Sequence, residues 1–194
     1  MTKHELLEPL AKLRVDQIVI TTMGTVRPWA TYSHHPLDFA SADSAMGHAA
    51  DFALGIALAQ PKRGIICLNG DGSMLMTLGT LVTIINARVK NLILFVVQND
   101  TYEVTGNQSI PGAGFVDFCA IANGAGFRRT HSFSDAQAYE RKLPEILSGE
   151  GPVFVTVKVQ AGEEGPLSRS PKETADYLRC SLAESTRGLR ATLR

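Results

Sequence analysis

Two mostly apolar segments with the length of β-strands, residues 64–70 and 91–98, are separated by one helix-length stretch. The first reads GIICLNG and the second NLILFVVQ. Uninterrupted apolar strands are typical of parallel sheets that helices cover on both faces. The spacing therefore predicts a βαβ unit with a helix from about Met74 to Val89, which restricts the chain to the α/β class.

The rest of the chain continues this alternation of helices and strands. We therefore predict a doubly wound, mostly parallel sheet with helices on both faces, which binds ligands beyond the carboxyl ends of its strands. The other predicted elements are a helix with apolar residues at 6, 7, 10 and 13, a strand at 16–22, a small-residue helix at 44–60, a loop at 99–114, a helix at 115–126, a short strand near 127–132, a helix at 135–148 and a strand at 152–159.

We expect residues 1–160 to form one domain, and residues 161–194 to form a linker and a polar helix, from about Pro171, that packs on the domain or on a partner. Nineteen basic residues balance nineteen acidic ones, which disfavours nucleic acid or an anionic membrane as a partner. The apolar runs are shorter than a bilayer span, and residues 1–15 do not resemble a signal peptide. These features predict a cytoplasmic location.

An acidic residue, Asp71, stands between two glycines at the end of the first apolar segment. A Gly-Asp-Gly sequence alone is most often a turn. However, the second apolar segment ends just before Asn99, so both side chains are expected at the same edge of a parallel sheet. Carboxylate and amide oxygens are ligands that Mg²⁺ or Ca²⁺ prefers, and the helix expected after Ser73 offers free N–H groups to a phosphate. The pair predicts a cation and diphosphate site.

The sequence GDGS at 70–73, followed by a helix, a strand and QNDTY at 98–102, resembles the cofactor motif of the pyrophosphate (PP) domain of thiamine diphosphate-dependent enzymes. The similarity extends upstream through SAMGHAADFALGIALAQ and downstream through TGNQSIPGAGFVDFCAIANGAGF. These stretches are similar to sulfopyruvate and phosphonopyruvate decarboxylases, and the resemblance covers most of residues 20–160. It implies a thiamine diphosphate-binding fold, with thiamine diphosphate and Mg²⁺ as cofactors.

The resemblance also implies roles for individual residues. Asp71, the Asn99 amide oxygen and the Thr101 carbonyl are the implied Mg²⁺ ligands, although many members of the family have Gly where this chain has Thr101, and Gln98 replaces the first Asn of the usual pair. Met46 is implied to lie under the thiazolium, and the Ser44 carbonyl to accept from the aminopyrimidine. The other implied cofactor contacts are Gly24, Thr25, Gly47, His48, Gly70, Gly72, Ser73 and Tyr102. Met46 and His48 are also candidates for a catalytic role.

In the resembling enzymes, the acid that protonates the aminopyrimidine is a Glu on a separate pyrimidine-binding (PYR) domain, and this chain has no candidate segment for that domain. We therefore expect a PP subunit that forms an oligomer with a PYR-domain subunit and decarboxylates a small 2-oxo acid to CO₂ and an aldehyde. The alternatives are a carboligase, a 2-oxo acid oxidoreductase subunit, or a cofactor-binding protein without catalysis. A Rossmann oxidoreductase is disfavoured, because no G-x-G-x-x-G follows the first strand.

The sequence leaves the roles of several polar side chains undecided. His34 and His35 are interpreted as surface histidines rather than active-site residues. Glu103 is interpreted as a solvated loop carboxylate rather than a proton carrier. Gln108 is given equal weight as a cofactor contact and as a surface residue, and of Arg128 and Arg129 at most one can face a site, since neighbours on a strand point to opposite faces.

Overall fold

A computed structural model describes residues 1–42 and 46–193, which fold around one six-stranded sheet in the order β2-β1-β3-β4-β8-β7. Every neighbouring pair in this sheet is parallel, which confirms the predicted doubly wound α/β class. The strands are β1 (Ile18–Thr21), β2 (Asp38–Ala40), β3 (Ile65–Gly70), β4 (Leu92–Gln98), β7 (Arg129–Phe133) and β8 (Val153–Lys158).

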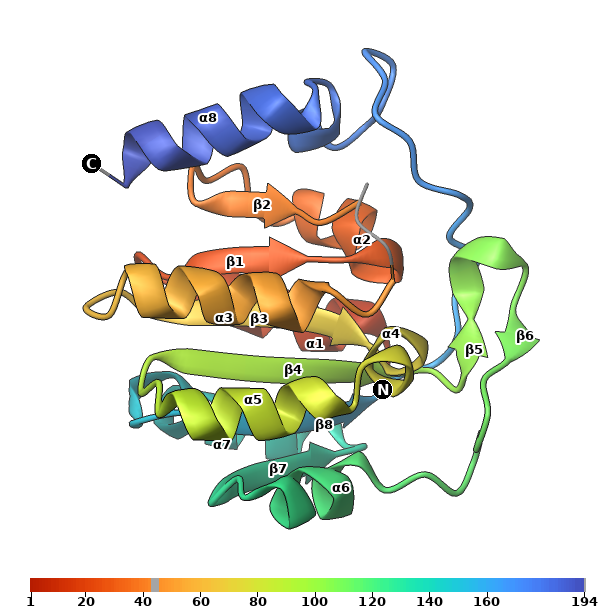
Figure 1. Cartoon of the computed structure of the whole chain (residues 1–194). Helices are drawn as coiled ribbons and strands as arrows, with labels where there is room; N and C mark the ends of the chain where they lie inside the picture. Colours follow the sequence, from red (N-terminus) through yellow and green to blue (C-terminus); the bar gives the residue numbers. More distant parts are fainter. Residues whose placement is uncertain (43–45, 194) are drawn as a thin grey trace.

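Helices cover both faces of the sheet and enclose two apolar layers (Figure 1). One layer lies under α3, α5 and α6, with Leu189 of α8 added at its edge, and the other lies under α1, α2 and α7. The helices are α1 (Lys3–Leu13), α2 (Val26–Ala30), α3 (Ala49–Ala59), α4 (Asp71–Met76), α5 (Gly79–Ala87), α6 (Phe118–Ala125), α7 (Ala136–Ser148) and α8 (Leu182–Thr192). Within the described ranges, no helix combines the length and hydropathy that crossing a bilayer requires.

The direction of the winding changes between β1 and β3. The chain passes from β1 outward to β2, whereas it passes from β3 in the opposite direction to β4. The segments that leave β1 and β3 at their carboxyl ends therefore diverge, and in folds of this class the space between them is where ligands bind. Asp71 begins α4 immediately after β3, so the fold delivers it to this point.

Two predicted helices differ from the structure in their bounds. The helix expected at 44–60 begins only at Ala49, because Gly47 has φ +99°, a left-handed conformation that a helix cannot contain. The helix expected from Met74 to Val89 is instead two helices, since α4 ends at Met76 and α5 begins at Gly79. The Thr77 hydroxyl donates to the Gly47 carbonyl at 2.7 Å, so a tertiary contact holds the break.

Several short elements have no counterpart in the sequence prediction. They are α2 and β2, the two-stranded hairpin of β5 (Thr101–Tyr102) and β6 (Gln108–Ser109), and three turns of 3-10 helix at Met23–Thr25, Glu103–Thr105 and Asp176–Leu178. Each has five residues or fewer, too few to show a hydrophobic period. The hairpin lies within the predicted loop at 99–114.

The tail after β8 runs along the carboxyl edge of the sheet, past the β5–β6 hairpin, before α8 lies beside β2 (Figure 1). Its helix begins at Leu182 rather than near Pro171, because Ser181 and Glu184 form a capping box there. Before that point, the Arg27 guanidinium binds the Glu173 carboxylate at 2.8 and 3.0 Å and the carbonyls of Gly165 and Pro166 at 3.0 and 2.9 Å. These contacts hold the tail in an extended course against α2.

Candidate cofactor site

A cavity of about 450 Å³, its open mouth included, lies at the carboxyl edge where the winding changes direction. Three segments line most of it: residues 22–25 after β1, residues 70–73 after β3, and the loop that begins after β4. Met46 lines it ahead of α3, and Lys3 lines it from α1. The two halves of the sequence motif therefore meet in one cavity, although a helix and a strand separate them along the chain.

Asp71 is buried in the wall of this cavity, with 2% of its surface exposed. One carboxylate oxygen accepts the backbone N–H groups of Asn99 and Asp100, at 2.9 and 2.6 Å, and the other accepts that of Gly72 at 2.7 Å. Burial raises the pKa of Asp71 to about 6, although these N–H groups favour the ionised form. A cation beside this carboxylate would offset the cost of burying its charge.

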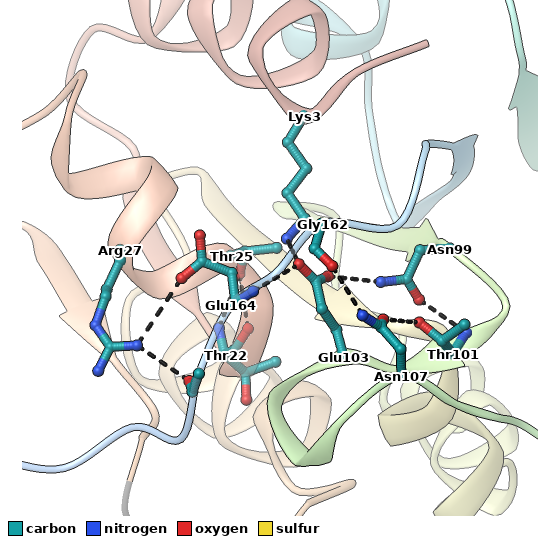
Figure 2. Close-up of polar contacts among 11 residues, drawn as sticks. Lys3, Thr22, Thr25, Arg27, Asn99, Thr101, Glu103, Asn107, Gly162 and Glu164 are labelled. Carbon is teal, nitrogen blue, oxygen red and sulfur yellow. Dashed lines mark hydrogen bonds and ion pairs between the residues drawn. The ribbon is translucent and has the colours of Figure 1, made fainter.

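Asn99 lies at the end of β4 with both ends of its side-chain amide bonded (Figure 2). The amide oxygen accepts the backbone N–H of Thr101 at 3.0 Å, and the amide nitrogen donates to the Glu103 carboxylate at 2.7 Å. Asp100 has φ +61°, which allows the chain to turn sharply between Asn99 and Thr101. The turn brings the residues on both sides of it to the cavity wall.

The polar atoms that the turn gathers suit a hard divalent cation. Asp71 offers a carboxylate, Asn99 an amide oxygen and Thr101 a main-chain carbonyl, all of them oxygen ligands of the kind that Mg²⁺ accepts. Among residues 1–42 and 46–193, no group of three His, Cys, Asp or Glu side chains is placed to hold a metal. A cation at this edge would therefore be held by the single carboxylate of Asp71, by amide and carbonyl oxygens and by the ligand's own phosphate groups, which is how Mg²⁺ is commonly held.

Gly72 is the glycine of the motif that close packing requires. A Cβ atom placed on Gly72 would lie 2.5 Å from a ring carbon of Tyr102 and 3.1 Å from a methyl group of Ile110. Nothing lies within 4 Å of the corresponding position on Gly70. Gly70 is therefore next to open space, whereas the absence of a side chain at Gly72 allows the Tyr102 ring to pack directly on the backbone.

Ser73 connects the motif to the segment that precedes α3. Its hydroxyl oxygen accepts the backbone N–H of Gly47 at 2.9 Å, so the hydroxyl proton remains available to a ligand oxygen. This bond and the one from Thr77 hold Gly47 from both sides. Met46, which precedes it, is thereby fixed at the cavity.

The structure brings most of the residues predicted to contact the cofactor to this cavity. Those that line it are Gly24, Thr25, Met46, Gly70, Asp71, Gly72, Ser73, Asn99, Thr101 and Tyr102. Gly47 lies behind the wall, bonded to Ser73. His48 is exposed, pairs with Asp51 at 2.8 Å and lines a separate groove between α3 and α8. Ser44 lies outside the described residues.

Most of the side chains whose roles the sequence leaves undecided lie away from the cavity. His34 is exposed and pairs with Asp176 at 3.1 Å, and the ring nitrogen of His35 accepts the Leu37 N–H at 3.1 Å. Gln108 is exposed and binds Thr105. Arg128 is exposed, while Arg129 donates to carbonyls of the segment that follows α7 and of α7 itself.

The interpretation of Glu103 as a solvated loop carboxylate is wrong. Glu103 is 6% exposed rather than solvated, and its carboxylate pairs with the Lys3 ammonium at 2.7 Å. Lys3 comes from the first helix, one hundred positions earlier in the chain. No local pattern around either residue signals this contact, because the pairing depends on the packing of α1 beside the carboxyl edge.

The fold and the cavity are those expected of a domain that binds a diphosphate cofactor at a sheet edge, and comparison of the sequence with known families supports this assignment. Residues 22–157 match the thiamine pyrophosphate enzyme C-terminal TPP-binding domain, and the chain belongs to this family. This confirms the predicted family and its cofactor, thiamine diphosphate.

Two relatives in the curated proteins show how far the similarity extends. The chain is 35% identical over 163 residues to the sulfopyruvate decarboxylase subunit beta of Methanothermobacter thermautotrophicus, with 84% of each chain covered. It is 34% identical over 166 residues to the phosphonopyruvate decarboxylase of Streptomyces viridochromogenes, which covers 85% of this chain but only 41% of that enzyme.

A solved structure supports the fold. The thiamine diphosphate-dependent 4-hydroxybenzoylformate decarboxylase of Rhodococcus jostii superposes with a TM-score of 0.70 at 22% identity, over 84% of this chain and 33% of that one. The chain thus spans less than half the length of these phosphonopyruvate and 4-hydroxybenzoylformate decarboxylase chains, and most of the sulfopyruvate decarboxylase subunit.

Proposed function

We propose that this chain is the PP subunit of a heteromeric, Mg²⁺-dependent thiamine diphosphate enzyme that decarboxylates a small 2-oxo acid of the sulfopyruvate or phosphonopyruvate type. The observation that carries the proposal is the match to a separate decarboxylase subunit, which covers 84% of that subunit and of this chain. The cavity at the carboxyl edge supports it, because the residues of both motif halves line the same space.

In this proposal, Asp71, the Asn99 amide oxygen and the Thr101 carbonyl hold Mg²⁺. The Ser73 hydroxyl donates to the diphosphate from one side, next to Gly72, whose N–H binds Asp71. Gly24 and Thr25 approach the diphosphate from the other side. Met46 supports the thiazolium, with Ser44, which is not described, as a partner of the aminopyrimidine. When bound, thiamine diphosphate accepts the electron pair left behind as CO₂ departs. The chain's own residues bind and orient the cofactor.

The acid that protonates the aminopyrimidine is proposed to come from a PYR-domain partner. Two acidic side chains line the cavity in the described part of the chain, and both are already bonded. Asp71 accepts three backbone N–H groups, and Glu103 pairs with Lys3 and Asn99. Neither is placed as a free proton donor, which supports a carboxylic acid from a second chain.

The proposal is tested by calorimetric titration of the chain with thiamine diphosphate, with and without Mg²⁺, alone and mixed with a candidate PYR-domain subunit. We expect Mg²⁺-dependent binding, and CO₂ release from sulfopyruvate or phosphonopyruvate only in the mixture. Product analysis separates decarboxylation, which yields an aldehyde, from carboligation, which yields a new carbon–carbon bond. Full decarboxylase activity of the chain alone contradicts the need for a partner, and absence of binding in both samples contradicts the proposed function.

The pKa of Asp71 predicts a pH dependence for cation binding. Because burial raises this pKa to about 6 in the cation-free chain, Mg²⁺ must displace a proton at lower pH. We expect the Mg²⁺ affinity to be constant above about pH 7 and to fall about tenfold per pH unit well below pH 6. Calorimetric Mg²⁺ titrations at saturating thiamine diphosphate measure this, with free thiamine diphosphate titrated in the same buffers to correct for its own protonation. An affinity that rises as the pH falls would contradict this role of Asp71.

A further inference from the structure

The Glu103 carboxylate is a buried junction between three segments that are distant in the sequence (Figure 2). One of its oxygens accepts the Lys3 ammonium at 2.7 Å and the backbone N–H of Glu164 at 3.3 Å, and the other accepts the Asn99 amide nitrogen at 2.7 Å. A Cβ on Gly162 would lie 2.4 Å from the first oxygen. The carboxylate is therefore packed as well as bonded, which fixes its position.

This junction determines which way the Asn99 amide faces. A carboxylate is only an acceptor, so the amide atom nearest to it has to be the nitrogen. Rotating the amide by half a turn would place its oxygen against the Glu103 carboxylate with no proton between them. Glu103 thus holds the Asn99 oxygen on the opposite side, where the Thr101 N–H now binds it.

Lys3 makes this carboxylate compatible with an anionic ligand. The side chains of Lys3 and Glu103 are 13% and 3% exposed, and both residues line the cavity. An unpaired buried carboxylate would be costly in itself and would repel a diphosphate nearby. With the ammonium at 2.7 Å, the pair as a whole is neutral.

We propose that Glu103 is a positioning residue for the metal: it orients the Asn99 amide so that the oxygen is presented to the cation, while Lys3 cancels the charge of Glu103 beside the diphosphate. This inference rests on the proposed function, since it assigns a role to residues behind the same metal site. Hydrogen-bonded partners of metal ligands act in this way in other metal sites, where their loss typically weakens metal affinity about 10–100-fold.

The test compares two double variants in which residues 3 and 103 are both neutral and which differ in whether residue 103 offers an acceptor to Asn99. Lys3→Met with Glu103→Gln keeps an amide oxygen for the Asn99 nitrogen, whereas Lys3→Met with Glu103→Leu removes it. Mn²⁺, used as the probe cation, is titrated into each full chain at saturating thiamine diphosphate, and free Mn²⁺ is measured by electron paramagnetic resonance. We expect the leucine variant to bind Mn²⁺ about 10–100-fold more weakly than the glutamine variant.

A matched control is the buried pair of Arg14 and Asp38, which lies where α1 ends and β2 begins, with side chains 4% and 1% exposed. Arg14→Met with Asp38→Leu removes an ion pair of similar burial outside the cavity, and we expect Mn²⁺ affinity to be unchanged. If the Glu103→Leu chain does not fold, Glu103→Met in the same Lys3→Met background makes the same comparison with a more adaptable side chain.

The outcomes separate the two proposals. Equal Mn²⁺ affinity in the glutamine and apolar variants, with cation-dependent cofactor binding intact in the unmodified chain, overturns the positioning role and leaves the proposed function standing. Absence of cation-dependent binding in the unmodified chain overturns the proposed function, and the positioning role with it.

Discussion

Replacing Asp71 with asparagine or alanine is expected to abolish Mg²⁺-dependent binding of thiamine diphosphate. Asp71 is the charged group among the three proposed metal ligands, and its carboxylate also joins the turn after β3 to the loop after β4 through three N–H groups. Removing a direct ligand should cost more than the loss of an outer partner, so we expect affinity to fall by more than about 100-fold. Calorimetric titration of cofactor in the presence of Mg²⁺ measures the effect.

The asparagine variant isolates the contribution of charge, because it keeps the size of the side chain and one accepting oxygen. Asp51→Asn is the matched control: this acid lies on α3, partly exposed, bonded to His48 and Thr80 outside the cavity. Its replacement should leave cofactor binding unchanged. If Asp71→Asn bound thiamine diphosphate and Mg²⁺ as the unmodified chain does, Asp71 would not be a metal ligand.

Gly72→Ala is expected to destabilise the chain and to weaken cofactor binding together. The added methyl group would lie 2.5 and 2.8 Å from two ring carbons of Tyr102, so the ring and the β5–β6 hairpin that begins beside it must move. Overpacking of this kind typically costs about 1–3 kcal/mol. Urea unfolding followed by circular dichroism measures the loss of stability, and the cofactor titration measures the loss of affinity.

Gly70→Ala provides the comparison within the same motif. Gly70 has φ −86° and nothing within 4 Å of the added carbon, so alanine meets no steric obstacle there. We expect its free energy of unfolding to change little, because alanine restricts the unfolded chain more than glycine does but is less favourable than glycine at the N-cap of α4. If the two variants were equally stable, the packing of the Tyr102 ring would not require the absence of a side chain at position 72.

The sequence could predict those parts of the fold and site that depend on local sequence patterns. The apolar runs that form β3 and β4 are each followed directly by a polar residue of the motif, Asp71 or Asn99, and parallel pairing alone places these two positions at one edge. The approach of Asp71 to Asn99 is therefore predictable from the order and length of the elements between them.

The rest depends on contacts that no local pattern encodes. The break between α4 and α5 accompanies a hydrogen bond from Thr77 to Gly47, thirty positions earlier. The burial of Glu103 depends on Lys3, whose own neighbours read only as the first turn of an amphipathic helix. In both cases the local pattern is compatible with the observed structure, but tertiary packing selects that structure from several possibilities.

The course of the tail has a consequence for the order in which this chain is completed during synthesis. The last strand of the main sheet ends at Lys158. The tail groups that bind Glu103 and Arg27 come later in the chain, between Glu164 and Glu173. Contacts that close long loops form late, since ordering the intervening chain must come first. All six strands of the main sheet therefore precede the tail in the chain, and the segment between Glu164 and Glu173 then adds long-range contacts at the carboxyl edge of that sheet.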